Sequence, residues 1–125
     1  MRVVAIVNDL ILFSRIDAAA AAGNARLTRL DNLFELPPAT DVDLLLVDWS
    51  SRAPEWGGEI ATWRSGAAVR VIAFGRHTDL DAHAAARSSG IGPMWARSKL
   101  VAELPGLLRT AGRLSPGSPE LETSR

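Results

Sequence analysis

The sequence predicts a single α/β domain built on a five-stranded parallel sheet with helices on both faces. Short, almost wholly apolar runs alternate along the 125 residues with alanine-rich segments of helical period. Strict alternation of strand and helix favours a parallel sheet joined by right-handed crossovers. Hydrophobic residues make up 47% of the chain and charged residues 22%, which is typical of a globular domain with one core.

The first strand and the first helix have the clearest patterns. Residues 2–7, RVVAIV, are mostly β-branched and apolar, as expected for a strand buried on both faces. Residues 10–22 place Phe13 and Ile16 on one helical face, and Gly23 is expected to end this helix.

The second strand is expected at an edge of the sheet. In residues 25–30, ARLTRL, the leucines at 27 and 30 are separated by polar residues, so this strand should be half-exposed. The segment NLFEL, residues 32–36, then predicts a short helix that ends at Pro37 and Pro38.

The third strand is expected to end at Asp48, and two more elements follow it. A weak helix is predicted over PEWGGEIATWRSG, residues 54–66, where Gly57 and Gly58 each cost about 1 kcal/mol relative to alanine. Residues 68–74, AVRVIAF, form the fourth strand.

The last third of the chain supplies the remaining units. Thr78, followed three residues later by Asp81, is similar to a capping box and predicts the start of a helix over 80–89. PMWA, residues 93–96, is a short fifth strand, and the final helix is expected to begin at Pro105.

The strand order and the domain limits follow from these units. Five units in little more than a hundred residues suit the flavodoxin-like order 2-1-3-4-5, with strand two at an edge. The expected domain covers residues 1–112. Residues 113–125 are rich in Pro, Ser and Gly and have no apolar period, which predicts a flexible tail.

Composition argues against several classes of function. The net charge is zero and the arginines are scattered, so we expect no nucleic-acid partner. No apolar run is long enough to cross a bilayer, and a membrane-surface role lacks its basic amphipathic helix. The chain has no cysteine, and its N-terminus has the pattern of a strand instead of a signal peptide, so we expect a cytoplasmic protein.

Polar residues follow several strands at the sheet edge where ligands bind in this kind of fold. Asn8 and Asp9 follow strand one, and Asp48 ends strand three. Basic residues follow strands four and five: Arg76, Arg97 and Lys99. Two carboxylates at a cleft can hold Mg²⁺, and a metal-neutralised aspartate beside a basic group suits an aspartyl-phosphate. An aspartate at a strand end can also cap the next helix, so both interpretations stay open.

From residue 2 to about residue 111 the sequence resembles a response-regulator receiver domain. The similarity lies in the segments VAIVND, LLLVDWS, VIAFGRH and GIGPMWARSK. In order, they resemble the first receiver strand with its acidic pair, the strand that bears the phosphorylated aspartate, the fourth strand, and the fifth strand with its basic residue. The resemblance implies a signalling domain, not a conventional enzyme, and a protein partner.

The resemblance also implies roles for single residues. Asp48 matches the phosphoacceptor, Asp9 matches one member of the metal-binding pair, and the backbone carbonyl of Ser50 matches the third protein ligand of Mg²⁺. Arg97 best matches the essential lysine that contacts the phosphoryl group. A register shift of one or two residues would place Lys99 there instead.

Three positions depart from the receiver pattern. Asn8 stands where the family has a second acidic residue, and Gly75 stands where a Ser or Thr hydroxyl bonds the phosphoryl group. Met94 stands where a switch Tyr or Phe is common. The resemblance therefore implies the fold more strongly than it implies Mg²⁺-dependent phosphorylation of Asp48.

Two functions from different classes follow. The first is a stand-alone receiver-like signalling or adaptor module, whose protein partner or second copy docks on the face formed by residues 80–89, 93–96 and 105–112. The second is a small flavodoxin-like enzyme or ligand-binding protein that uses the crevice at the ends of strands one and three. In the second, basic residues would contact a nucleotide or anion: Arg76, Arg97 and Lys99. The lack of a glycine-rich phosphate loop weighs against it.

The tryptophans carry separate expectations. Trp56 and Trp63 are seven residues apart on one helical face and are expected to pack on the sheet. Trp49 is expected on the opposite side of the strand end from Asp48, near the rim of the crevice.

Overall fold

The computed structural model describes residues 1–49, 56–76 and 78–114, with side chains as far as residue 109. Its centre is a five-stranded parallel sheet in the order β2-β1-β3-β4-β5, which confirms the predicted fold class and strand order. The strands are β1 (Arg2–Ile6), β2 (Arg26–Leu30), β3 (Leu44–Asp48), β4 (Arg70–Gly75) and β5 (Trp95–Ala96). Strand β2 lies at an edge and is half-exposed to exposed along its length, as the polar residues between its leucines predicted.

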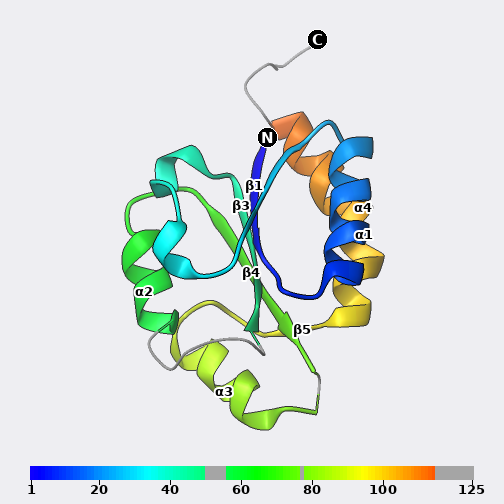
Figure 1. Cartoon of the computed structure of the whole chain (residues 1–125). Coiled ribbons are helices and arrows are strands. Elements are labelled where there is room, and N and C mark those ends of the chain that lie inside the picture. Colours follow the sequence, from blue (N-terminus) through cyan, green and yellow to red (C-terminus); the bar gives the residue numbers. More distant parts are fainter. Residues whose placement is uncertain (50–55, 77, 115–125) are drawn as a thin grey trace.

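Helices cover both faces of the sheet, with α1 and α4 together on one side and α2 on the other (Figure 1). The helices are α1 (Leu10–Ala22), α2 (Trp56–Trp63), α3 (Leu80–Ser88) and α4 (Arg97–Leu114), with 3₁₀ turns η1 (Leu33–Glu35) and η2 (Ala39–Asp41). None of the helices in the described part of the chain is long and apolar enough to cross a lipid bilayer.

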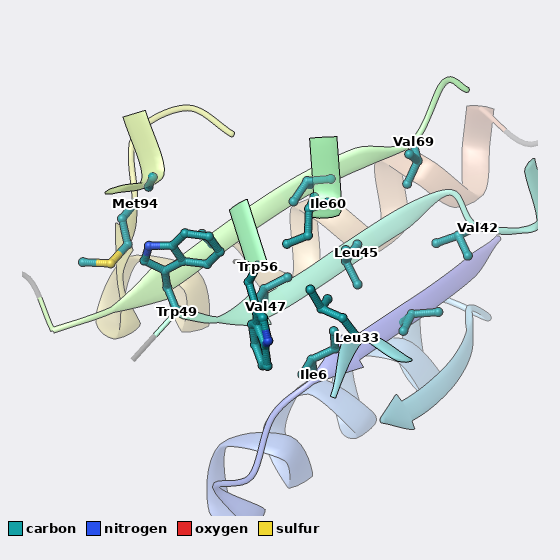
Figure 2. Close-up of a cluster of buried hydrophobic side chains, with 14 of the residues drawn as sticks. Ile6, Leu33, Val42, Leu45, Val47, Trp49, Trp56, Ile60, Val69 and Met94 are labelled. Atoms are coloured by element: carbon teal, nitrogen blue, oxygen red, sulfur yellow. The ribbon is translucent and has the colours of Figure 1, made fainter. Parts of the chain in front are cut away.

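Alternation along β3 divides the core into two layers. Leu44 and Leu46 pack with α1 and α4, whereas Leu45 and Val47 pack with α2 and α3 (Figure 2). Successive side chains of a strand point to opposite faces. The alternation therefore places Asp48 on the side of α1 and α4, and it sets the direction from which a partner can reach its carboxylate.

Trp49 continues the alternation on the other side of the sheet. It is 1% exposed within the layer that includes α2 and α3, and its indole Nε1–H donates to the Ala82 carbonyl at 3.1 Å. The expected side of the strand is confirmed, but the expected position at the crevice rim is wrong. The large apolar ring is buried because α3 lies over the end of β3 and supplies an acceptor for its N–H.

The other two tryptophans of the predicted face pack as expected. Trp56 is buried in the same layer as Trp49, and Trp63 is half-buried against that layer. The Trp63 Nε1–H donates to the Pro37 carbonyl at 2.7 Å. Packing also explains the glycine at position 57, because a Cβ there would collide with the Ser89 side chain at the end of α3.

The start of α3 differs from the prediction. The residue that caps it is Asp79, whose Oδ1 accepts the Ala82 N–H at 3.0 Å, and not Thr78. A carboxylate directly before the helix accepts this bond well, and the capping-box spacing assigned the cap one residue too early.

The start of α4 also differs from the prediction. The helix begins at Arg97, and Pro105 lies inside it on the exposed side. An interior proline removes one backbone hydrogen bond. Packing outweighs this loss, because side chains four residues apart are buried against the sheet: Leu100, Leu104 and Leu108. The helix continues to Leu114, past the predicted domain end at residue 112, and residues 115–125 of the predicted tail lie outside the described residues.

Candidate functional site

The candidate site lies at the carboxyl edge of the two central strands. β1 and β3 are neighbours, with Ile6 paired to Val47, so the residues that follow these two positions emerge side by side. Asp9 is the N-cap of α1, and Asp48 is the last residue of β3. Arg97, the first residue of α4, follows directly after β5.

A single guanidinium joins the two carboxylates. Arg97 Nη1 lies 3.0 Å from Asp9 Oδ2, and Arg97 Nη2 lies 3.3 Å from Asp48 Oδ2. Both contacts are hydrogen-bonded ion pairs. The Asp48 side chain is only 3% exposed, whereas that of Asp9 is 35% exposed and that of Arg97 is 41% exposed. The arrangement is thus one buried carboxylate and one half-buried carboxylate held by the same cation.

Asp48 is the one buried residue with a polar or charged side chain in the part of the chain that the structure describes. Burying a carboxylate is costly unless it is paired and hydrogen-bonded. The Arg97 guanidinium reduces this cost, because it supplies both an opposite charge and a donor. The Arg97 Nε is itself buried and has no hydrogen-bond partner among the described residues.

Asp9 caps helix α1 in addition to forming its ion pair with Arg97. Its Oδ1 accepts the N–H of Ile11 at 3.0 Å and the N–H of Leu12 at 3.1 Å, which caps α1. The interpretation of a strand-end aspartate as a helix cap is therefore confirmed for Asp9. The Leu12 N–H lowers the pKa of Asp9 below its ordinary value of 3.8. The Ile11 N–H and Arg97 lower this pKa further, while partial burial opposes them.

The lowered pKa of Asp9 predicts how stability depends on pH. Because the folded-state pKa lies below 3.8, the unfolded state binds more protons near that pH. The stabilisation from the Asp9 carboxylate is therefore complete above its unfolded pKa and is lost as the pH falls through the folded pKa. We expect Asp9→Asn, which preserves a good N-cap, to be less stable than the wild type near neutral pH.

The stability difference between wild type and Asp9→Asn should shrink as the pH falls below about 4. Urea unfolding of both proteins across this range measures the difference. A difference that stays constant down to about pH 3 would contradict a charged role for Asp9.

Magnesium is the ion that the resemblance to receiver domains implies, and Mg²⁺ requires several oxygen ligands in near-octahedral geometry. Both oxygens of Asp9 already accept hydrogen bonds, and Oδ2 of Asp48 contacts Arg97. The described residues include no group of three acidic, His or Cys side chains that could hold a metal. The predicted carbonyl ligand, Ser50, lies outside them. With Arg97 between the carboxylates, the described residues do not fit a divalent cation.

The other predicted site residues that the structure describes have different surroundings. Lys99 is exposed, and its Nζ stands 4.6 Å from the centroid of the Trp95 ring, a cation–π contact. Arg97 and not Lys99 therefore reaches the carboxylates. Met94 is buried in the layer of α2 and α3, while Asn8 is exposed. Gly75 ends β4, paired with Ala96, and Arg76 follows it as an exposed residue.

Sequence reasoning found all three residues of the cluster but missed how they combine. The sequence resemblance implies that Asp48 is a phosphoacceptor, that Asp9 and Asp48 hold a metal, and that Arg97 contacts a phosphoryl group. The position of Asp9 directly before a helix was a usable sign of its capping role. The sequence carries no comparable sign for Arg97, because its partners are 88 and 49 residues away.

Comparison with known proteins gives matches in structure only. No protein-family model and no curated protein sequence matches the chain. A response regulator from Thermotoga maritima is similar in structure, with a TM-score of 0.65 and 14% identity over 88% of this chain and 95% of that one. An orphan response regulator of H. pylori has a TM-score of 0.65 and 20% identity over 87% of this chain and 97% of that one.

A third similar structure is an atypical orphan response regulator, described as having a phosphorylation-independent regulatory mechanism. Its TM-score is 0.61, with 18% identity over 87% of this chain and 96% of that one. At these identities the similarity shows the fold. The chain has the receiver fold of response regulators, as the sequence resemblance implied.

Proposed function

We propose that this chain is a receiver-like signalling or adaptor module that acts through contacts with another protein and does not require phosphorylation of Asp48. The receiver fold supports the general class of function. The observation that carries the phosphorylation-independent part is the Arg97 guanidinium bound to both Asp9 and Asp48.

Several features of this site oppose phosphoryl transfer to Asp48. The Asp48 side chain is almost fully buried, and its Oδ2 is paired with Arg97. A phosphoryl group would also add negative charge to a site whose cationic group is already shared by two carboxylates, and the described residues do not fit the divalent cation that could offset it. Gly75 has no hydroxyl to bond the phosphoryl oxygens.

The comparisons with solved structures support the phosphorylation-independent part of the proposal. Two of the three similar structures named above are orphan response regulators, and one of these is described as regulated independently of phosphorylation. The alternative function, a crevice for a nucleotide or anion, is less well supported. It would use Arg76, Arg97 and Lys99 to contact the ligand, whereas two carboxylates of the chain hold Arg97.

The contact surface that we propose is the face formed by α3, β5 and α4, for a protein partner or for a second copy of the chain. Arg97 begins α4 directly after β5, so the ion pairs with Asp9 and Asp48 connect this face to the two central strands. The face offers exposed small side chains at Ala84 and Ala102. The charged side chains of Arg87 and Lys99 are also exposed there.

Photo-crosslinking in cells tests this surface. A photoreactive amino acid would replace Ala84 or Ala102, with Ala18 on the exposed side of α1 as the matched control position. We expect one discrete protein adduct from the first two positions and none from the third. The adduct, either a partner or a dimer, would then be reproduced with purified proteins. Adducts from Ala18 alone would contradict the proposed surface.

Phosphorylation is tested separately on the purified chain. Incubation with Mg²⁺ and a small phosphodonor, followed by intact-mass analysis, should give no phosphoryl adduct. The crosslink at Ala84 should persist in Asp48→Asn, which cannot accept a phosphoryl group. A phosphoryl adduct that disappears in Asp48→Asn, together with a crosslink that requires Asp48, would overturn the phosphorylation-independent part of the proposal.

A further inference from the structure

We infer that Arg97 is the permanent counter-ion of this site and stands in place of a divalent cation, so that loss of its guanidinium would turn the site into one that binds a divalent metal. The inference deepens the proposed function, because it explains why the module would need no metal. It concerns the chain alone, however, and its test involves no partner.

The geometry supports the first part of this inference. Asp9 caps α1 shortly after β1, Asp48 ends the adjacent strand β3, and both offer Oδ2 to the same guanidinium, at 3.0 and 3.3 Å. A guanidinium presents several N–H donors in a planar fork and keeps its charge at all physiological pH values. It therefore provides the two things that a bound metal would provide here, which are positive charge and directed contacts to both carboxylates.

Competition for the same oxygens supports the second part. A divalent cation that bound both Oδ2 atoms would have to occupy the region that Nη1 and Nη2 now occupy. A divalent cation and the Arg97 guanidinium are both positively charged and would repel each other strongly in the same region, particularly beside the buried Asp48. A metal that used these two oxygens could bind only after Arg97 had left, and the free energy of the two ion pairs would weaken its apparent affinity.

The place of Arg97 in the chain gives the substitution a structural consequence. Arg97 is both the first residue of α4 and the residue that contacts Asp9, at the start of α1, and Asp48, at the end of β3. A free metal ion could dissociate and leave α4 unattached to these carboxylates. A covalently attached counter-ion cannot dissociate, so the start of α4 stays joined to the central strands at any metal concentration.

Mn²⁺ binding to the purified full chain tests this inference, with Mn²⁺ as a spectroscopic probe for the Mg²⁺ class of ion. Electron paramagnetic resonance would report free Mn²⁺ in titrations of wild type, Arg97→Ala and Lys99→Ala. Lys99→Ala is the matched control, because it removes the same charge two residues away without touching the carboxylates.

We expect Arg97→Ala to bind Mn²⁺ at least about tenfold more tightly than wild type, the scale on which groups around metal ligands alter affinity. Lys99→Ala should match wild type, and adding Asp48→Asn to Arg97→Ala should abolish the gain. Equal affinities in Arg97→Ala and Lys99→Ala would overturn the inference, and so would tight binding by wild type.

A second measurement covers the case in which Arg97→Ala does not fold, as judged by circular dichroism. Arg97→Met retains much of the apolar stem and can replace it in the titration. Thermal unfolding of the wild type over rising Mg²⁺ should show no stabilisation, because a ligand raises stability only by binding the folded state. An unfolding temperature that rises with Mg²⁺ in wild type and not in Asp48→Asn would show a resident metal site and refute the role of Arg97.

Discussion

Arg97→Met should lower the free energy of unfolding by about 2 kcal/mol, somewhat less than the roughly 3–5 kcal/mol that follows when one member of a fully buried ion pair is removed. The effect is large because the Asp48 side chain is 3% exposed and would lose the cation that contacts its Oδ2. The expected cost is smaller than for a fully buried pair because Arg97 is 41% exposed, which lets water reach part of the cluster.

A double-mutant cycle separates the ion pair from other effects of the substitution. Asp48→Asn removes the charge that Arg97 neutralises, so the two substitutions together should cost less than the sum of their separate costs, by about 1–2 kcal/mol. Urea unfolding of the four proteins gives the coupling free energy. Lys99→Met is the control, and as an exposed substitution it should change stability by no more than about 0.5 kcal/mol. Additive costs would mean that Arg97 and Asp48 do not stabilise each other.

Trp49→Ala should lower the free energy of unfolding by about 3–5 kcal/mol, the largest effect that we expect from a single substitution. The side chain is 1% exposed, and its removal would leave a cavity between β3 and α3. The hydrogen bond to the Ala82 carbonyl would also be lost. A loss of this size is a large part of the total stability of a small domain, roughly 5–15 kcal/mol.

A milder substitution and a control position make the Trp49 prediction measurable if Trp49→Ala unfolds. Trp49→Phe keeps most of the ring and should cost roughly 1–3 kcal/mol, from the lost hydrogen bond and the smaller volume. Trp63→Phe is the matched control, because Trp63 also donates its N–H to a backbone carbonyl but is only half-buried. Denaturant unfolding should rank Trp49→Phe as the more damaging change, and the reverse ranking would contradict the burial of Trp49.

The burial of Trp49 also affects the candidate site, because Trp49 follows Asp48 directly. Trp49 and Asp48 are consecutive residues whose side chains lie on opposite faces of β3. Trp49 holds the end of β3 against α3, while Asp48 holds it near α4 through Arg97. The end of this strand is thus fixed from both layers, which favours a site with one stable arrangement over one that opens readily.

Local patterns were sufficient to predict the sheet. Residues 3–7 are continuously apolar and most of them lie in the central strand β1, whereas residues 26–30 mix polar and apolar side chains and form the edge strand. Periodicity reports which faces of an element are buried, and strict alternation of strands and helices leaves few topologies. The carboxyl edge, with Asp9 and Asp48 side by side, follows from that topology alone.

Local patterns failed where a contact between distant residues outweighed them. Pro105 normally favours the start of a helix, but α4 begins at Arg97 because buried leucines on either side of the proline hold it against the sheet. Trp49 was expected at a rim, but α3 covers it. In both cases the free energy of burial comes from another part of the chain, which no local window includes.

The sequence by itself determined the parallel sheet, its strand order and the edge at which the two aspartates meet, because these features follow from the period of apolar side chains and from chain connectivity. Only the tertiary structure decided what the aspartates bind. Arg97 is 88 residues from Asp9 and 49 residues from Asp48 in the sequence. Its flexible side chain could have pointed to solvent, to a ligand or to either carboxylate. Folding brings α4 against the ends of the central strands, where burial of Asp48 makes a paired cation the arrangement of lower free energy.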